Sequence, residues 1–521
     1  MKREWMLQLL ENQRSSWDVV VIGGGASGIG AALDAATRGY RTVLIEQHDF
    51  SKGTSSRSTK LIHGGVRYLQ QGDVSLVIEA LHERGLLLRN APHLVHHQSF
   101  IIPAYDWWEG PFYKVGMKVY DLMAGKLGLG PSEHLSRNEV LQAIPTLKTE
   151  GLRGGIIYYD GQFNDSRLAI NLVQSFVENG GIAINYMKCI GLMKATDGMI
   201  AGVIARDEET GKEYSLPARV VVNATGVWAD DILKMDRPEA PKTIVPSQGV
   251  HVVIDKEYLQ SPHAIMIPHT DDGRVLFAVP WHDKVVVGTT DTPVPHADIE
   301  PRALQDEINF ILHTASRYLA KPVSRKDVKS IFAGLRPLAA PEDEEKTTKN
   351  ISRSHKIIVS VSGLITIIGG KWTTYRRMAQ DAIDKAALIG GLPESPCRTH
   401  HMPIHGAVIA LPKEDSLHVY GADSIQIKEL MTSQQELAKP LSPLLPYTGA
   451  EVIWAVRHEM ARTVEDVLAR RTRALFLDAR ESIRIAPEVA SLMAKEMKKD
   501  NHWIRQQVDS YTHLARGYLP E

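Results

Sequence analysis

The chain has 521 residues, of which 43% are hydrophobic and 23% are charged, and its formal net charge is −1. This length exceeds the usual limit of one core and predicts two or three domains, while the near-zero net charge excludes recruitment of nucleic acid by a global basic field. Cys189 and Cys397 stand far apart and in no metal-ligand spacing, which excludes a disulfide framework and indicates a reducing compartment. The N-terminal stretch has no apolar signal-peptide core and the longest apolar runs are too short to span a bilayer, so we expect a cytoplasmic chain that does not cross a membrane.

The first predicted elements form a strand–turn–helix–strand unit between Trp17 and Glu46. An apolar strand leads into glycines in G-x-G-x-x-G spacing, a helical segment follows, and a second apolar strand ends on Glu46. The glycines allow a tight turn, close approach to a pyrophosphate and close helix–strand packing, and the helix N-terminus offers free N–H groups to the anion. Glu46 would accept hydrogen bonds from a ribose, which argues against NADP and leaves FAD and NAD open. The predicted cofactor contacts here are Gly23, Gly25, Ala26, Ser27, Gly28 and Glu46.

Three later segments are candidates for the rest of the cofactor site. The loop from Thr54 to Tyr68 combines hydroxyls, a Gly-Gly turn and a histidine that can wrap a flat ring; the alternative is a flexible linker. A strand ends in an Ala-Thr-Gly turn at 224–226, and the GGKWTT segment at 369–374 opens a helix. This second helix-N-terminal anion site would face a flavin pyrimidine ring, which favours FAD over NAD. The candidate residues are Thr54, Ser55, Ser56, Ser58, Lys60, Leu61, His63, Gly64, Gly65, Ala224, Thr225, Gly226, Gly370, Lys371, Thr373 and Thr374.

The remaining pattern predicts an α/β fold with three units. Helical spacing is expected from about 74 to 89 and from 165 to 179, and many antiparallel strands follow between about 244 and 292. We predict a Rossmann-type FAD-binding domain, an inserted antiparallel substrate-binding sheet and an all-α C-terminal cap. Their expected ranges are 17–95 with 150–240 and 355–395 for the first, 96–149 with 241–354 for the second, and 396–521 for the cap.

Three arginines indicate the charge of the substrate. Arg67, Arg336 and Arg353 stand in apolar or Gly/Pro-rich stretches, not on charged helix faces. An arginine among apolar neighbours needs an anionic partner, and its planar fork matches phosphate oxygens. Each of them could equally pair with a nearby Asp or Glu, so this pattern favours a phosphorylated substrate without establishing it.

Seven segments together resemble the FAD-dependent glycerol-3-phosphate dehydrogenases: IGGGASG, SSRSTKLIHGGVRYL, SQGVHVVI, VPWHDKVVVGTTD, GLRPL, ISRSH and IIGGKWTTYRRMA. The likeness runs from about residue 17 to 385 and more loosely into the C-terminal helical region. It implies a glycine-oxidase-like fold with FAD across the glycine fingerprint, the Ser/His/Gly loop and the GGK turn, and it places His251 near the substrate hydroxyl. Trp372 departs from the leucine found in many members. Residues around the substrate would be Arg67, Tyr68, Arg336, Arg353, Lys371 and Thr373.

The resemblance implies oxidation of sn-glycerol 3-phosphate to dihydroxyacetone phosphate by hydride transfer to FAD. We expect His251 to take the C2 hydroxyl proton, with Arg336 as the rival that holds the developing alkoxide. The alternatives are a glycerol-3-phosphate oxidase, a flavin dehydrogenase of another small 2-hydroxy acid, and a non-catalytic flavoprotein.

Reoxidation by a quinone is expected, because oxygen-using members tend to carry an insertion for which this length leaves little room. A quinone would place the chain peripherally on the cytoplasmic face of the inner membrane. The aromatic and basic stretch 107–129 fits either an interfacial helix or a core helix. The oligomeric state stays open, and a homodimer is compatible with the sequence.

Overall fold

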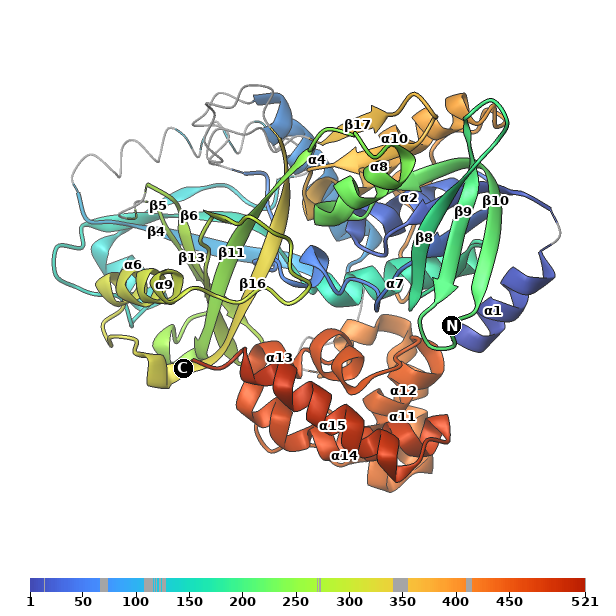
Figure 1. The fold of residues 1–521 in the computed structure, drawn as a ribbon. Helices are drawn as coiled ribbons and strands as arrows, with labels where there is room; N and C mark the ends of the chain where they lie inside the picture. Colours follow the sequence, from blue (N-terminus) through green and yellow to red (C-terminus); the bar gives the residue numbers. More distant parts are fainter. Residues whose placement is uncertain are drawn as a thin grey trace.

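The computed structural model describes residues 1–13, 15–65, 74–106, 116, 118, 120, 123, 128–268, 270, 273–340, 355–408 and 415–520. Within these residues two β-sheets lie side by side, and a helical C-terminal region packs below both (Figure 1). The predicted α/β class is therefore confirmed, with a nucleotide-binding sheet, a second largely antiparallel sheet and a helical C-terminal region.

The first sheet has the parallel core that the N-terminal sequence pattern predicts. β1 (Trp17–Ile22) pairs in parallel with β2 (Thr42–Ile45) on one side and with β10 (Glu213–Asn223) on the other. The apolar run Val19–Ile22 is fully buried because helices cover this sheet, as a central parallel strand requires. Helix α2 (Ala26–Thr37) packs between α7 (Asp165–Glu178) and α10 (Tyr375–Ile389). The strand order is β17 (Lys356–Val359), β18 (Ile365–Ile368), β10 (Glu213–Asn223), β1 (Trp17–Ile22), β2 (Thr42–Ile45) and β7 (Ile182–Ile184), and β8 (Met187–Lys194) and β9 (Ile200–Asp207) continue from β10.

The second sheet collects strands from distant parts of the chain. β6 (Gly154–Phe163) lies in this sheet, although its residues fall in the 150–240 range that we predicted for the FAD-binding domain. It pairs with β4 from Val95 opposite Phe163 to Ala104 opposite Gly154, and pairing of this kind is not encoded locally. The strand order is β15 (Thr292–Pro293), β11 (Ile244–Asp255), β14 (Lys284–Gly288), β13 (Leu276–Trp281), β12 (Ala264–Ile267), β4 (Val95–Ala104), β6 (Gly154–Phe163) and β3 (Leu61–Ile62), with β16 (Val328–Ala339) on β11 and β5 (Glu133–Ser136) on β6.

The helices follow their sequence signals closely. The predicted helix at 74–89 is α4, which runs from Val74 to Asn90. Asn164 caps α7, since its side chain accepts a hydrogen bond from the backbone N–H of Arg167. Among the helices in the described part of the chain, none combines the length and hydrophobicity that crossing a bilayer requires. Most of the predicted interfacial stretch 107–129 lies outside the described residues. The remaining helices outside the C-terminal region are α1 (Arg3–Asn12), α6 (Arg137–Ala143), α8 (Ala229–Asp236) and α9 (Gln305–Tyr318).

The C-terminal region shares an apolar core with the second sheet, which contributes Val253, Trp281, Val286 and Phe332, and it also packs on α7 of the nucleotide-binding unit. One contact to helix α7 is ionic: His405 lies between the carboxylate of Glu178, at the end of α7, and that of Asp423 in the C-terminal region. Burial lowers the pKa of His405, but the two carboxylates outweigh burial and raise it to about 9. The helices of this region are α11 (Ser424–Ser433), α12 (Gly449–His458), α13 (Ala474–Leu477), α14 (Ala479–Met497) and α15 (Asn501–Arg516).

Candidate active site

A cavity of about 770 Å³ is lined by residues from both sheets. It brings together segments that are hundreds of residues apart in sequence, including the glycine fingerprint, the turn after β18 and the second sheet's His251. Such a volume is in the range of small-molecule and cofactor sites. The predicted residues that line it are Gly23, Gly25, Ala26, Ser27, Glu46, Thr54, Ser55, Ser58, Leu61, His63, Gly65, Ala224, Thr225, Gly226, His251, Arg336, Gly370, Lys371 and Thr373.

Two of the fingerprint glycines, Gly23 and Gly28, leave no room for a side chain. Gly23 has φ +110°, and a Cβ added to it would lie 2.6 Å from the carbonyl oxygen of Ala224. A Cβ on Gly28 would lie 1.9 Å from the carbonyl oxygen of Gly23, so α2 can approach β1 only with glycine here. Gly28 therefore serves packing and does not line the cavity. The N-terminus of α2, which begins at Ala26, opens beside the cavity with its positive dipole end.

Glu46 lies at the tip of β2, where the fingerprint predicts an acid. Its carboxylate accepts hydrogen bonds from the backbone N–H groups of Gly24 at 2.6 Å and His48 at 2.8 Å. Burial raises the pKa of Glu46, and these two hydrogen bonds oppose the shift. Each carboxylate oxygen has a second lone pair, so the group can still accept ribose hydroxyls.

The residues from 46 to 65, here called the wrapping segment, follow the cavity wall. Ser55 holds the segment against α2, since its Oγ accepts a hydrogen bond from the Ala26 N–H at 2.9 Å. Lys60 points away from the cavity: its Nζ lies 2.6 Å from Asp165 Oδ2 and 2.9 Å from the Ser56 carbonyl oxygen. Burial lowers the pKa of Lys60 to about 7, against the opposing effect of Asp165. Five of the predicted cofactor residues thus stand outside the lining: Gly28, Ser56, Lys60, Gly64 and Thr374.

The turn after β18 reaches the cavity as predicted and is joined to the wrapping segment. Gly370 has φ +82°, and a Cβ on it would lie 2.3 Å from Met378 Sδ. Trp372 donates its indole N–H to the carbonyl oxygen of Ser55 at 2.8 Å, and its ring meets Phe163 edge-on at 5.5 Å. Trp372 therefore links the turn after β18 to the wrapping segment through this hydrogen bond.

His251 is a buried neutral imidazole on β11. Its Nε2 lies 2.9 Å from Thr59 Oγ1, and its ring stacks on Phe332 with 4.8 Å between centroids. Gly288 on β14 provides the space for the ring, because a Cβ there would lie 2.4 Å from His251 Cδ2. Burial first, and then the charges of Lys60 and Arg336, hold the pKa of His251 well below 6.5. The imidazole is therefore in its proton-accepting form at neutral pH.

Arg336 reaches the same cavity from β16, and it has a carboxylate partner. Its Nη1 lies 3.2 Å from Asp291 Oδ1, and its Nη2 donates to the Thr290 carbonyl oxygen at 2.9 Å. The alternative that the sequence left open, pairing with a nearby Asp, thus holds for this arginine. Gly249 makes room for the guanidinium, since a Cβ there would lie 2.4 Å from Nη2. Arg67, Tyr68 and Arg353 lie outside the described residues.

Sequence reasoning missed Thr59 and Arg274, which both line the cavity. Thr59 stands inside the predicted loop, but nothing local shows that it faces His251. Arg274 precedes the apolar strand β13, so the criterion that selected Arg336 would also have selected it. The same cavity has an aromatic wall in which Phe100 stacks on Tyr158 at 5.1 Å and meets Phe277 edge-on at 5.9 Å.

Comparison with known proteins identifies the family. The model of the FAD dependent oxidoreductases matches residues 18–376, and that of the C-terminal domain of alpha-glycerophosphate oxidase matches residues 365–503. Mitochondrial glycerol-3-phosphate dehydrogenase of Homo sapiens is 40% identical over 558 residues, which cover 99% of this chain and 76% of that protein. The chain belongs to the FAD-dependent glycerol-3-phosphate dehydrogenases.

Solved structures agree with this family. The glycerol-3-phosphate dehydrogenase of Bacillus halodurans, complexed with FAD, superposes with a TM-score of 0.81 at 28% identity and covers 99% of this chain and 97% of that chain. Glycine oxidase of Bacillus cereus shares the fold, with a TM-score of 0.52 at 20% identity over 73% of this chain and 99% of that chain. The predicted glycine-oxidase-like fold is confirmed.

FAD is the cofactor of this family, and the cavity fits it. Gly23, Gly25 and the N-terminus of α2 line the cavity and supply the close backbone approach and the free N–H groups that a pyrophosphate needs. Gly226 lines the cavity and has φ +61°. A Cβ added to it would meet no atom within 4 Å, so the space beside this turn is free for a ligand. Both predictions, the flavin cofactor and an FAD-dependent enzyme, are confirmed.

Proposed function

We propose that this chain oxidises sn-glycerol 3-phosphate to dihydroxyacetone phosphate. The observation that carries the proposal is the single cavity, in which a dinucleotide fingerprint meets a neutral histidine and an arginine from the second sheet. A relative that is 40% identical and bears the name glycerol-3-phosphate dehydrogenase supports this choice of substrate.

FAD, when bound, supplies the acceptor for the hydride that leaves C2 of the substrate. His251 takes the proton of the C2 hydroxyl, because its low pKa keeps the imidazole unprotonated at working pH. Thr59 and Phe332 hold the ring by its Nε2 and by one face, so the base is oriented before substrate arrives.

Arg336 stabilises negative charge as it develops on the C2 oxygen. Its guanidinium is fixed by Asp291 and by oxygens of the loop after β14, which prepares its orientation before the reaction. Lys371 and Thr373, on the turn after β18, line the same cavity and orient the substrate phosphate. We assign Arg67, Tyr68 and Arg353 to the phosphate as well, on the motifs that they share with the family.

We also infer that a quinone takes up the electrons. The relatives named dehydrogenases support an acceptor other than oxygen, and a quinone requires contact with lipid. Peripheral attachment to a membrane follows from this inference. Flotation with liposomes would test the attachment, sedimentation would test for a homodimer, and parallel turnover with a quinone analogue and with oxygen would test the acceptor.

The decisive experiment adds glycerol 3-phosphate to the purified flavoprotein without oxygen. We expect fast bleaching of the flavin, slow bleaching by glycerol, and none by 2-hydroxyglutarate. In His251→Ala the rate should fall by about 10²–10⁴-fold, the usual contribution of a general base. The rate of flavin reduction by wild type should fall on the acid side only below pH 6.5, because the pKa of His251 is depressed. Equal bleaching by 2-hydroxyglutarate would overturn the substrate, and an unchanged rate in His251→Ala would overturn the base.

A further inference from the structure

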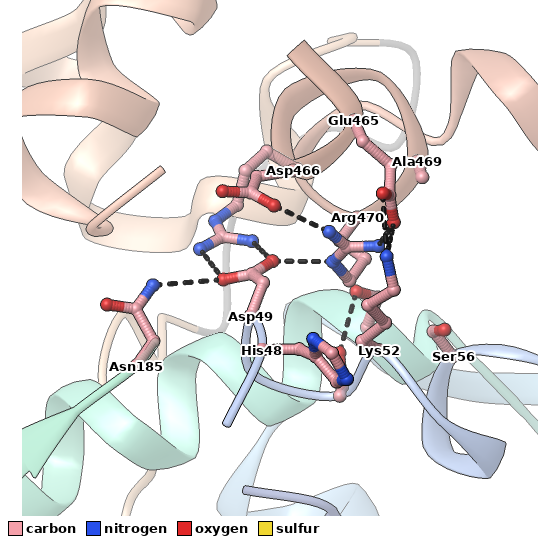
Figure 2. A network of polar contacts seen from close by, with 12 residues as sticks. His48, Asp49, Lys52, Ser56, Asn185, Glu465, Asp466, Ala469 and Arg470 are labelled. Atoms are coloured by element: carbon pink, nitrogen blue, oxygen red, sulfur yellow. Dashed lines mark hydrogen bonds and ion pairs between the residues drawn. The ribbon is translucent and has the colours of Figure 1, made fainter. Parts of the chain in front are cut away.

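The C-terminal region holds the wrapping segment from the side opposite the cavity. Figure 2 shows Asp49 and Lys52 of the wrapping segment facing Glu465, Asp466 and Arg470 of the C-terminal region. His48, Ser51 and Lys52 line the cavity, so the ion pairs are made directly behind its wall.

The first set of contacts is centred on the buried carboxylate of Asp49. Arg470 donates its Nε–H to Asp49 Oδ2 at 2.5 Å, and Arg471 donates to both carboxylate oxygens, at 2.6 and 2.8 Å. Glu465 accepts from Lys52 at 2.7 Å and from Arg470 at 2.7 Å. The two arginines hold the pKa of Asp49 below its usual value despite burial. Asp49, Arg470 and Arg471 are out of water, so the Asp49 carboxylate depends on its two partners across the interface.

The second set is centred on Arg473. Its side chain is 1% exposed and donates to the Ser56 carbonyl oxygen at 2.6 Å, while its Nη2 lies 3.3 Å from Asp165 Oδ1. The other oxygen of that carboxylate accepts from Lys60 and from the Ser58 hydroxyl. Arg473 thus grips the backbone between Ser55 and Ser58, two residues that line the cavity.

The backbone at Arg473 is strained, which indicates that its side chain is needed where it is. Its φ is +68°, in the left-handed region that a long side chain rarely adopts. Such conformations persist where the surroundings over-determine them. Here the guanidinium also donates to the Ala469 carbonyl oxygen and lies 4.1 Å above the Phe476 ring. Phe476 in turn meets Phe332, the ring under His251, at 5.0 Å.

We propose that Arg473 is a positioning residue that, together with Glu465, Arg470 and Arg471, holds the wrapping segment in its FAD-binding conformation. Docking of the C-terminal region and binding of FAD are then thermodynamically linked, and each favours the other. The inference rests on FAD occupying the cavity and is independent of the substrate.

The test is the dissociation constant of FAD, measured by fluorescence titration of the apoprotein. We expect Arg473→Met to raise this constant at least tenfold and Arg473→Lys, which keeps the charge beside Asp165, to raise it less. The matched control is Arg457→Met, which breaks the Arg457–Glu496 pair within the C-terminal region at 2.7 Å without touching the wrapping segment. It should leave the constant within twofold. Thermal unfolding of each apoprotein reports the general loss of stability.

A wild-type constant in Arg473→Met would overturn the inference, as would an equal rise in Arg457→Met. If Arg473→Met does not fold, Glu465→Gln provides the test, because it weakens the contact to Lys52 from the C-terminal side. A several-fold weaker FAD complex supports the inference, and unchanged affinity refutes it. With FAD at saturation, the KM of the variants for glycerol 3-phosphate should stay near wild type. If the proposed substrate is wrong, turnover of glycerol 3-phosphate will fail in this assay, and the measured dissociation constants of FAD will be unaffected.

Discussion

Filling the space beside His251 tests how strongly the rate of flavin reduction depends on the position of the base. In Gly288→Ala the added Cβ would lie 2.4 Å from His251 Cδ2 and 2.8 Å from the Val250 carbonyl oxygen. Carbon atoms pack at about 3.5–4.0 Å, so the ring must move by roughly 1 Å. Phe332 and Thr59 already hold its face and its Nε2, so the ring cannot move without losing one of them.

The expected loss of rate follows from that displacement of the imidazole ring. A misplacement of about 1 Å costs on the order of 10²-fold in rate, or roughly 2.7 kcal/mol in the barrier. We therefore expect flavin reduction by glycerol 3-phosphate to slow about 100-fold in Gly288→Ala. FAD content should be unchanged, because the fingerprint does not touch Gly288. Gly191→Ala is the matched control, since a Cβ on this strand glycine would meet nothing nearer than 3.6 Å.

Anaerobic stopped-flow measurement of flavin reduction provides the assay, with His251→Ala and the double variant beside the single one. If Gly288→Ala acts through the imidazole, the double variant will be no slower than His251→Ala alone. Additive losses would show that the strand itself is damaged, and a wild-type rate in Gly288→Ala would refute the geometric reasoning.

Three further outcomes follow from the structure. Gly28→Ala should yield protein with little bound flavin, measured as absorbance per protein, because its Cβ would lie 1.9 Å from a backbone oxygen that cannot move cheaply; normal flavin content would contradict this. Arg336→Lys keeps the charge but loses the fork that Asp291 orients, so flavin reduction should slow by about 10²-fold or more; a retained rate would remove Arg336 from the mechanism. The folded-state pKa of His405 is raised from 6.5 to about 9, so its stabilisation, up to about 3 kcal/mol, is complete below pH 6.5 and lost as pH rises through 9. Thermal scans of His405→Gln should therefore differ from wild type at pH 6 and converge above pH 9, and a difference that grows with pH would contradict the assignment.

Local signals in the sequence identified the nucleotide-binding unit. The apolar run of β1, the glycine spacing and Glu46 are contiguous, and each has a steric or electrostatic reason that operates within about 30 residues. The helix caps and the start of α7 were predictable for the same reason. His251 was reached through a motif of the family and Arg336 through its apolar and Gly/Pro-rich neighbours, and both line the cavity.

Only the tertiary structure decided which side chains face that cavity. The wrapping segment is irregular, so no periodicity separates Ser55 and Ser58, which line the cavity, from Ser56 and Lys60, which do not. The partners of buried charges are equally invisible in sequence. Asp165 pairs with Lys60 and with Arg473, which lie more than one hundred and more than three hundred residues away in sequence, because desolvated charges require opposite charges wherever the fold can supply them. Sequence determined the cofactor and its fingerprint; long-range pairing of strands and ions determined the site built around them.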